Sequence, residues 1–273
     1  MSQCIYSLEC SILVLSLKII KFMIKNIADP HELLADFKLC SVYSDFSEIV
    51  LGKIKEYPLL LLKPKIVSLN KPNILVAAGF HGNEPGGPLG VLYAFQKYGE
   101  YFKEVNISFL PLINPTGYRL GSHYNSLGQN PNRNFCHKIE SNSIASVEGT
   151  FLLKHKELIQ KLSRDGFLSL HEDVDKHNFY FYTFGDEKTR QDLHSSLFGS
   201  LSKYFQPCLD QEIDRCPAKV AVIENNHDGS CEDWLFHSGS KFACATETPG
   251  RADVSLRAKA NAYLVKAFIQ LTS

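Results

Sequence analysis

The sequence predicts a single α/β domain built around a largely parallel sheet. Short apolar runs alternate along the chain with segments of helical periodicity, which favours strands joined by helices. The length of 273 residues suits one domain of this class. Polar turns directly follow several apolar runs, and open α/β sheets carry their active sites at the carboxyl ends of their strands.

Each predicted element rests on its local pattern. Apolar runs bounded by turn residues indicate strands, and apolar residues three or four positions apart indicate helices. Pro85 and Pro88 suit the first turn of a helix, where a missing N–H costs nothing. The predicted strands are Ile66–Leu69, Ile74–Gly79, Ile107–Ile113, Phe167–His171, Phe179–Phe184, Val220–Ile223 and Phe242–Thr246. The predicted helices follow Pro85-Gly86 to about Tyr98, run over Val147–Leu162, Glu187–Tyr204 and Val254–Ile269, and are preceded by an amphipathic stretch that opens at Asp29-Pro30.

Residues 1–22 are expected to lie outside the domain, which then comprises residues 23–273. The run Ser11–Ile20 is apolar, but Lys18 interrupts it and no small-residue cleavage site follows, unlike in a signal peptide. It is also too short to span a bilayer. The sequence from Met23 onward reads like an ordinary cytoplasmic start.

The composition excludes several classes of partner. With 29 basic and 29 acidic residues and no block of like charge, neither nucleic acid nor a membrane is an expected partner. The eight cysteines contain no C-x-x-C pair, so neither a disulfide scaffold nor a zinc ribbon is indicated. Scattered cysteines are typical of reduced thiols, which predicts a cytoplasmic protein.

A histidine and a carboxylate stand three residues apart in the turn Gly79–Gly86, directly after the apolar run Ile74–Ala78. A strand that ends in such a turn presents both side chains at the carboxyl edge of the sheet. A catalytic zinc site of the His₂Glu type needs three protein ligands and an open position for water. His81 and Glu84 are therefore candidate metal ligands.

The polar stretch Asn114–Ser146 is long for a connection inside a compact domain, and loops of that length are usually functional. It contains Asn132 and Arg133, an amide beside a planar guanidinium, which can hold a substrate carboxylate. An exposed ion pair of Arg133 is the plainer interpretation, because such pairs are common and weak.

Two further polar residues stand at the ends of predicted strands. His171 is a candidate third ligand, although an isolated histidine is more often a hydrogen-bonded structural residue. Glu172 or Asp173 beside it could orient the imidazole. Glu247 could be an exposed loop charge. Near a metal-bound water it would instead act as a general base that passes a proton to the leaving amine.

Taken in order, these segments resemble the zinc carboxypeptidase family (peptidase family M14) from about Ile74 to Gly250. His81-x-x-Glu84 is similar to the family's zinc pair, and His171 to its third ligand. Glu247 is similar to the catalytic glutamate of the family's T-x-E strand. The resemblance implies a metallopeptidase with one zinc ion per chain and a three-layer α/β/α fold around a mixed, largely parallel sheet.

Two further blocks support this resemblance. Asn132-Arg133-Asn134-Phe135 matches the N-R-N-[FW] motif, whose Asn and Arg hold the substrate's terminal carboxylate. Gly229–Trp234 resembles the G-S-x-D-W segment with one additional residue. In the family, the residue before D-W lies at the base of the side-chain pocket. Here that residue is Glu232, or Cys231 because of the additional residue. Glu232 at that position would imply a preference for a basic side chain or the amino end of diaminopimelate, whereas a solvated loop charge is the plainer interpretation.

The chain also departs from the family pattern R-x-N-x-x-G-x-D-x-N-R, in which the first Arg stabilises the developing oxyanion. In that register His123 stands where this Arg is expected. Either a protonated His123 substitutes, or Arg119 reaches in, or activity is low, since losing one oxyanion donor typically costs about 10²–10³ in rate. The mobile Tyr of digestive members is also missing, and Tyr180 or Tyr182 could fill its place.

Three functions remain open on the sequence. The first is a carboxypeptidase acting on a small peptide, or a murein peptide amidase, to which the loop before Phe135 is also similar. The second is an N-acyl amino acid deacylase of the succinylglutamate desuccinylase or aspartoacylase type, whose loop reads D-L-N-R where this chain has Asn130-Pro131-Asn132-Arg133. The third is a non-catalytic zinc- or peptide-binding relative that has lost turnover through the change at His123.

Overall fold

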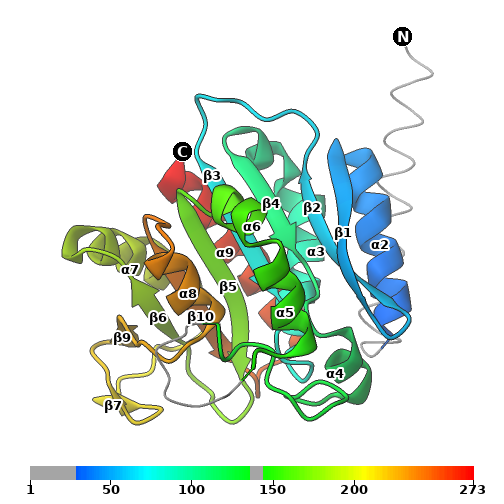
Figure 1. The fold of residues 1–273 in the computed structure, drawn as a ribbon. Coiled ribbons are helices and arrows are strands. Elements are labelled where there is room, and N and C mark those ends of the chain that lie inside the picture. Colours follow the sequence, from blue (N-terminus) through cyan, green and yellow to red (C-terminus); the bar gives the residue numbers. More distant parts are fainter. Residues whose placement is uncertain (1–28, 136–143) are drawn as a thin grey trace.

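The computed structural model describes residues 29–135 and 144–273, which form three layers (Figure 1). The middle layer is an eight-stranded sheet in the order β1-β2-β4-β3-β5-β10-β6-β9. Its four central strands, β4, β3, β5 and β10, are parallel, whereas β1, β2 and β6 join it by antiparallel pairing. The predicted mixed, largely parallel sheet is therefore confirmed. The strands are β1 (Phe46–Ile54), β2 (Tyr57–Pro64), β3 (Asn73–Ala78), β4 (Asn106–Leu110), β5 (Gly166–Asp173), β6 (Tyr180–Phe184), β9 (Val222–Glu224) and β10 (Ala243–Pro249), with a separate hairpin of β7 (Glu212–Ile213) and β8 (Cys216–Pro217).

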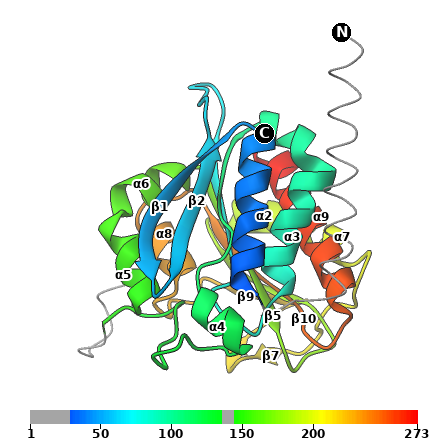
Figure 2. The ribbon, with the colours of Figure 1, turned by 90° about the vertical axis from the view of Figure 1, so that its right-hand side faces the viewer.

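Helices cover both faces of the sheet (Figure 2). Each face has its own apolar cluster, because a largely parallel sheet presents buried side chains on both sides. One helical layer contains α2 (Pro30–Tyr43), α3 (Gly86–Tyr98), α7 (Glu187–Leu201) and α9 (Val254–Thr272). The other contains α5 (Val147–Lys154), α6 (Lys156–Leu162) and α8 (Cys231–His237), and the short α4 (Pro115–Leu120) lies near one end of the sheet.

Close packing of α3 on α9 fixes the helix that follows the His81–Glu84 turn. Gly90 allows this approach, since a Cβ there would collide with the side chain of Asn261. Buried alanines of α9, Ala258 and Ala262, lie in the same apolar cluster as α3. The turn that carries the candidate ligands is thus held between a central strand and a tightly packed helix pair.

The first two strands were not predicted, and the predicted strand Ile66–Leu69 is wrong. Ile66 and Leu69 are 87% and 97% exposed and lie in a loop, because this short run has no neighbouring strand with which to pair. The sheet instead uses the hairpin of β1 and β2, in which Leu59–Leu62 are fully or almost fully buried. That continuous apolar run was the signal for a strand covered on both faces.

Helix prediction was better, with three differences. The helix predicted over Val147–Leu162 is interrupted at His155, whose ring hydrogen-bonds the carbonyl of Leu51 at 2.9 Å in β1. Helices α4 and α8 were not predicted, although α8 carries a local start signal. The Ser230 hydroxyl accepts a hydrogen bond from the Asp233 amide at 3.3 Å, as expected of an N-cap.

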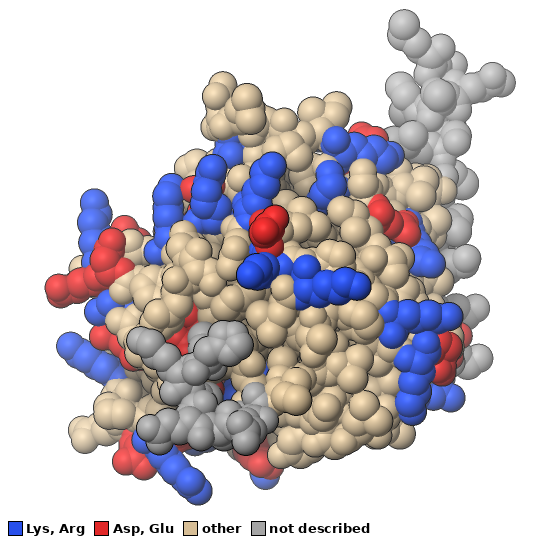
Figure 3. Space-filling model, viewed as in Figure 1, with Lys and Arg blue, Asp and Glu red and all other residues tan. Residues whose placement is uncertain are grey.

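The expected boundary between residues 1–22 and the domain lies outside the described residues. Within the described part of the chain, no helix has the length and apolarity needed to cross a membrane. Side chains of both charges occur over the face shown in Figure 3. This distribution agrees with the equal numbers of basic and acidic residues in the sequence.

Candidate metal centre and its pocket

The candidate ligands meet because the central strands end at the same edge of the sheet. After β3, Gly79 adopts a positive φ of 67°, and the following turn carries His81 and Glu84 into α3. His171 lies near the end of β5, and its register partner on the adjacent β10 is Glu247. In-register side chains of neighbouring strands point the same way, so Glu247 is directed to the same pocket as His171.

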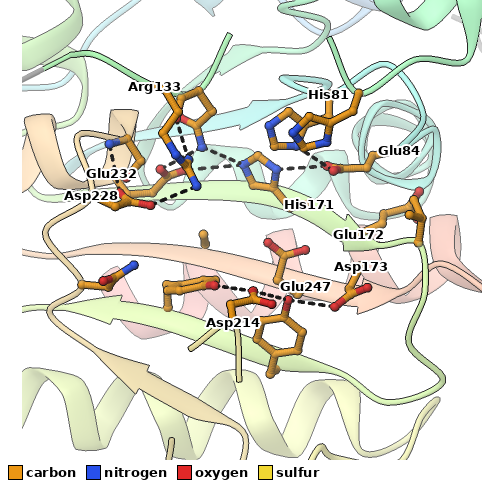
Figure 4. A pocket seen from close by; sticks show the side chains of 18 of the residues that line it. His81, Glu84, Arg133, His171, Glu172, Asp173, Asp214, Asp228, Glu232 and Glu247 are labelled. Carbon is orange, nitrogen blue, oxygen red and sulfur yellow. Dashed lines mark hydrogen bonds and ion pairs between the residues drawn. The ribbon is translucent and has the colours of Figure 1, made fainter. Parts of the chain in front are cut away.

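His81, Glu84 and His171 form one buried cluster. Nδ1 of His81 lies 2.6 Å from Oε1 of Glu84, and Nδ1 of His171 lies 3.0 Å from its Oε2 (Figure 4). All three residues are at most 7% exposed. Each imidazole therefore presents the same nitrogen to one carboxylate.

The outer nitrogens of both imidazoles face other polar groups. Nε2 of His81 lies 3.2 Å from Oδ1 of Asn130, which already accepts a hydrogen bond from the Asn132 amide at 2.9 Å. Nε2 of His171 lies 3.6 Å from Oε1 of Glu232. Protons on these outer nitrogens leave the two Nδ1 lone pairs facing Glu84. Two imidazoles and a carboxylate in this arrangement fit a zinc ion.

In the absence of a cation, the buried Glu84 carboxylate favours a protonated imidazole beside it. Burial alone would raise the pKa of Glu84, but His81 and His171 outweigh it and lower that pKa to about 2. Burial alone would lower the pKa of His171, whereas Glu84 and Glu232 raise it well above its usual value. Metal binding to such ligands releases protons.

His123 lies beside the cluster, but as a neutral imidazole. Its ring stacks on that of His81 with centroids 3.6 Å apart, and its Nε2 faces Nδ2 of Asn130 at 3.2 Å. Burial and the neighbouring His81 lower the pKa of His123 to about 4. The structure therefore does not support a protonated His123 at neutral pH.

Arg119 does not reach the pocket. It lies in the last turn of α4, its side chain is 58% exposed, and its guanidinium is 3.9 Å from the carboxylate of Asp29. It is not among the described residues that line the pocket. The geometry thus gives no support to Arg119 as the substitute for the expected oxyanion Arg.

Glu247 points into the pocket from β10, between His171 on one side and Asp173 and Asp214 on the other (Figure 4). Desolvation raises the pKa of this carboxyl well above its ordinary value. A bound cation would act in the opposite direction, because it favours the ionised form. Its position and environment suit a group that accepts a proton and later returns it.

Asn132 and Arg133 differ in how far they are available to a ligand. Asn132 is 4% exposed, and its amide is used internally: Oδ1 accepts from the Cys231 backbone at 2.8 Å, and Nδ2 donates to Glu232 at 3.1 Å. The side chain of Arg133 is 43% exposed and forms an ion pair of 3.1 Å with Asp228 at the pocket wall. Arg133 is therefore the better placed of the two to contact a carboxylate.

Glu232 lines the pocket, but its carboxylate is not free there. It is 1% exposed, and its two oxygens face His171 and Asn132. Burial would raise its pKa, but His171 lowers that pKa to about 2. Helix α8 places this carboxylate behind the ligand, where it orients the imidazole of His171.

Glu172, the other carboxylate expected to orient His171, has different partners. Its carboxylate instead contacts Arg257 of α9 at 2.6 Å and the Gly86 amide at 3.1 Å. Burial raises the pKa of Glu172 to about 7, although Arg257 opposes this shift. Glu172 thereby links β5 to the first turn of α3 and stabilises the turn that carries His81 and Glu84.

The far wall of the pocket carries two tyrosines and two aspartates. The hydroxyl of Tyr180 lies 3.0 Å from Asp173 and 2.9 Å from Asp214, either of which can accept its proton, and that of Tyr182 donates to Asp214 at 2.6 Å. Asp214 comes from the β7–β8 hairpin, and no local sequence signal marked it. Both tyrosines line the pocket, so either is close enough to take the place of the mobile Tyr found in digestive members of the family.

The pocket has a volume of about 250 Å³ and a strongly acidic lining. Among the described lining residues, Arg133 is the single Lys or Arg, against seven acidic residues. Asn130 and Asp228 were not singled out from the sequence, although both adjoin residues that were. The acidic residues are Glu84, Glu172, Asp173, Asp214, Asp228, Glu232 and Glu247.

Comparison with known proteins agrees with this geometry. Among curated proteins, none matches the chain. The structure of a candidate metallopeptidase from Shewanella amazonensis has 37% sequence identity and a TM-score of 0.86, covering 90% of this chain and 94% of that chain. A candidate metallopeptidase from Shewanella denitrificans has 34% identity and a TM-score of 0.83, with 90% and 91% covered.

A metallo-carboxypeptidase from Burkholderia cenocepacia shares the fold at 15% identity and a TM-score of 0.64, with 87% of this chain and 67% of that chain covered. The profile of the zinc carboxypeptidase family matches residues 58–267, which include every candidate ligand. The chain therefore belongs to the zinc carboxypeptidase family and is a zinc-dependent hydrolase of the metallocarboxypeptidase type.

Proposed function

We propose that this protein removes a basic C-terminal residue from a small peptide, or cleaves next to diaminopimelate in a murein peptide. The observation that carries the proposal is the pocket lining. A two-histidine, one-glutamate cluster and Glu247 face a space lined by one guanidinium and, on the tyrosine side, by the carboxylates of Asp173 and Asp214. Such a lining favours a substrate that carries both a carboxylate and a cationic group.

In this proposal His81, Glu84 and His171 hold one zinc ion per chain. When bound, zinc polarises a carbonyl oxygen and lowers the pKa of water toward neutrality. Glu247 accepts the proton of the attacking water and delivers it to the nitrogen of the leaving amine. The neutral imidazole of His123 lines the pocket beside His81 as a polar group and carries no fixed positive charge.

Arg133 binds the terminal carboxylate of the substrate. Its Nη1 donates to the carbonyl of Asn132 at 2.7 Å, and its Nη2 contacts Asp228 at 3.1 Å. These two contacts orient the planar guanidinium and leave part of its exposed fork for a ligand. Asn132 acts indirectly, because its amide joins Glu232 to the backbone of α8.

Asp214 and Asp173 provide the negative charge that recognises a basic side chain. They lie on the tyrosine side of the pocket, and Glu232, the residue expected in this role, is committed to His171. A lysine side chain or the amino end of diaminopimelate has the complementary charge. The same charge argument disfavours the dianionic substrates of N-acyl amino acid deacylases.

The test is a comparison of substrates that differ in one residue. Peptides ending in Lys, Leu or Glu, together with N-acetylaspartate and N-succinylglutamate, are incubated with zinc-loaded protein. We expect Lys to be released fastest and Glu slowest, with no turnover of the N-acyl amino acids. Cleavage of only the N-acyl amino acids would assign the protein to the deacylase class instead.

Glu247→Gln distinguishes catalysis from binding alone. The amide retains the shape of the side chain but cannot accept the proton, so we expect a loss of about 10²–10⁴ in kcat. Zinc content measured on the same preparation shows whether the metal site is intact. Full zinc content with no turnover in either protein would identify a non-catalytic relative.

A further inference from the structure

A second group of metal-binding side chains lies on the surface beside the pocket. Nδ1 of His227 is 2.8 Å from Oδ1 of Asp233, and Nδ1 of His237 is 2.9 Å from the same oxygen. The two imidazole rings are 4.7 Å apart between centroids. Three potential ligand atoms thus converge within 4.8 Å, none of them from the His81–Glu84–His171 cluster.

The cluster is rigid on its inner side and open on its outer side. Asp233 is 3% exposed, and its second oxygen accepts a hydrogen bond from the Gly229 amide at 3.0 Å. The side chains of His227 and His237 are 52% and 48% exposed. This layout gives a fixed carboxylate, two imidazoles and access for solvent to complete the coordination shell.

We infer that His227, Asp233 and His237 form a second divalent-cation site, which takes zinc or a similar transition metal rather than calcium or magnesium. Imidazole ligands favour zinc and similar transition metals, whereas calcium and magnesium prefer sites made entirely of oxygen. The carboxylate oxygen between the imidazoles offsets part of the cation's charge. The site shares no residue with those that carry out the proposed peptidase reaction.

A hydrogen-bond network is the competing account of the same residues. Both imidazoles can donate a proton to Asp233, and Nδ1 of His237 also lies 2.9 Å from the Asp233 carbonyl at the end of α8. In that account the cluster stabilises the helix and binds no cation. The two accounts differ in the number of metal ions that the folded protein holds.

A cation here would connect the pocket wall to α8. His227 immediately precedes Asp228, the partner of Arg133, and its ring lies 6.1 Å from that of Phe184, another lining residue. Binding would join the segment before α8, through His227, to Asp233 and His237 on the helix. The site would thereby stabilise the loop that carries the Arg133 partner.

The test is a count of zinc ions on the full chain. Protein freed of metal with a chelator is titrated with zinc chloride by calorimetry, and the bound zinc is measured after gel filtration. We expect two ions per wild-type chain and one in His237→Ala, His227→Ala and His81→Ala. His81→Ala combined with His237→Ala should hold none, and His177→Ala, at an exposed histidine outside the cluster, should hold two.

A wild-type chain that binds one zinc ion would overturn the proposal, as would retention of two ions by both His227→Ala and His237→Ala. His237→Gln replaces His237→Ala if circular dichroism shows that the alanine variant does not fold. Thermal unfolding of His81→Ala provides a second measurement. Zinc should raise its Tm, and the rise should disappear when His237 is also changed, since a ligand that binds only the folded state stabilises it.

Discussion

The amide oxygen of Asn130 lies 3.2 Å from Nε2 of His81, so a neutral side chain orients this candidate ligand. The family pattern has an aspartate at this position. The same amide presents its nitrogen to His123 at 3.2 Å and so connects the ligand to the residue that replaces the expected Arg. Two of the departures from the family pattern, Asn130 and His123, are therefore in direct contact.

We expect the side chain at position 130 to set the zinc affinity of the main site. Asn130→Ala removes the partner of His81 and should weaken zinc binding about 10- to 100-fold. Asn130→Asp should strengthen it, because a carboxylate raises the basicity of the imidazole more than an amide does. Competition with a coloured chelator measures both affinities. Unchanged affinity in Asn130→Ala would contradict the orienting role.

Replacement of Arg133 should affect binding more than turnover. Arg133→Ala is expected to raise KM for peptides with a free terminal carboxylate about 10- to 100-fold, because a charge-assisted, bidentate contact is lost. Arg133→Lys should recover part of the loss, since the charge remains but the planar fork does not. Steady-state kinetics would count against this role if kcat fell while KM stayed constant.

His123 and Arg119 should behave differently when each is replaced by alanine. His123 stacks on His81 at the pocket, whereas Arg119 pairs with Asp29 on the surface. We expect His123→Ala to lower kcat at least about tenfold, toward the range seen when one oxyanion-hole group is lost. Arg119→Ala should leave kcat unchanged. A large loss in Arg119→Ala would show that this side chain moves into the site with substrate.

Asp214 should determine the preference for a basic residue. Asp214→Asn keeps an acceptor for the hydroxyls of Tyr180 and Tyr182 but removes the negative charge. We expect kcat/KM for a C-terminal Lys to fall about tenfold, with little change for Leu, because only the charged side chain loses its partner. Equal effects on both peptides would indicate a structural role for Asp214.

Asp165 should make the free energy of unfolding depend on pH in the acidic range. Burial would raise its pKa, but Lys241 at 2.7 Å, the Asn73 amide and Arg164 outweigh this and lower it to about 2. A depressed folded-state pKa adds stability above the unfolded-state value of about 3.9, and this stability is lost as pH falls toward 2. At pH 7 Asp165→Asn should lower the free energy of unfolding by about 1–3 kcal/mol. In urea titrations the difference from wild type should shrink between about pH 4 and pH 2.

Much of the fold and of the site could be located in the sequence. The central strands β3, β5 and β10 are mostly apolar in their first residues, and candidate polar residues stand near or just after the carboxyl end of each. Parallel strands bring these ends to one edge, so His81, Glu84, His171 and Glu247 could be grouped before any coordinates were known. The β1–β2 hairpin was missed because the choice between nearby apolar segments depends on which one finds a pairing partner.

By itself, then, the sequence determined the central strands, the residue types of the candidate zinc ligands and the order of the motifs. These depend on local spacing and on where strands end. Only the tertiary structure decided what each polar group contacts. Glu232 meets Asn132 across 100 positions of sequence, and Asp214 reaches Tyr180 from a separate hairpin. Such contacts depend on how helices and loops pack, and that packing holds Glu232 beside His171 and Asn132 and brings Asp214 to the tyrosines of the pocket.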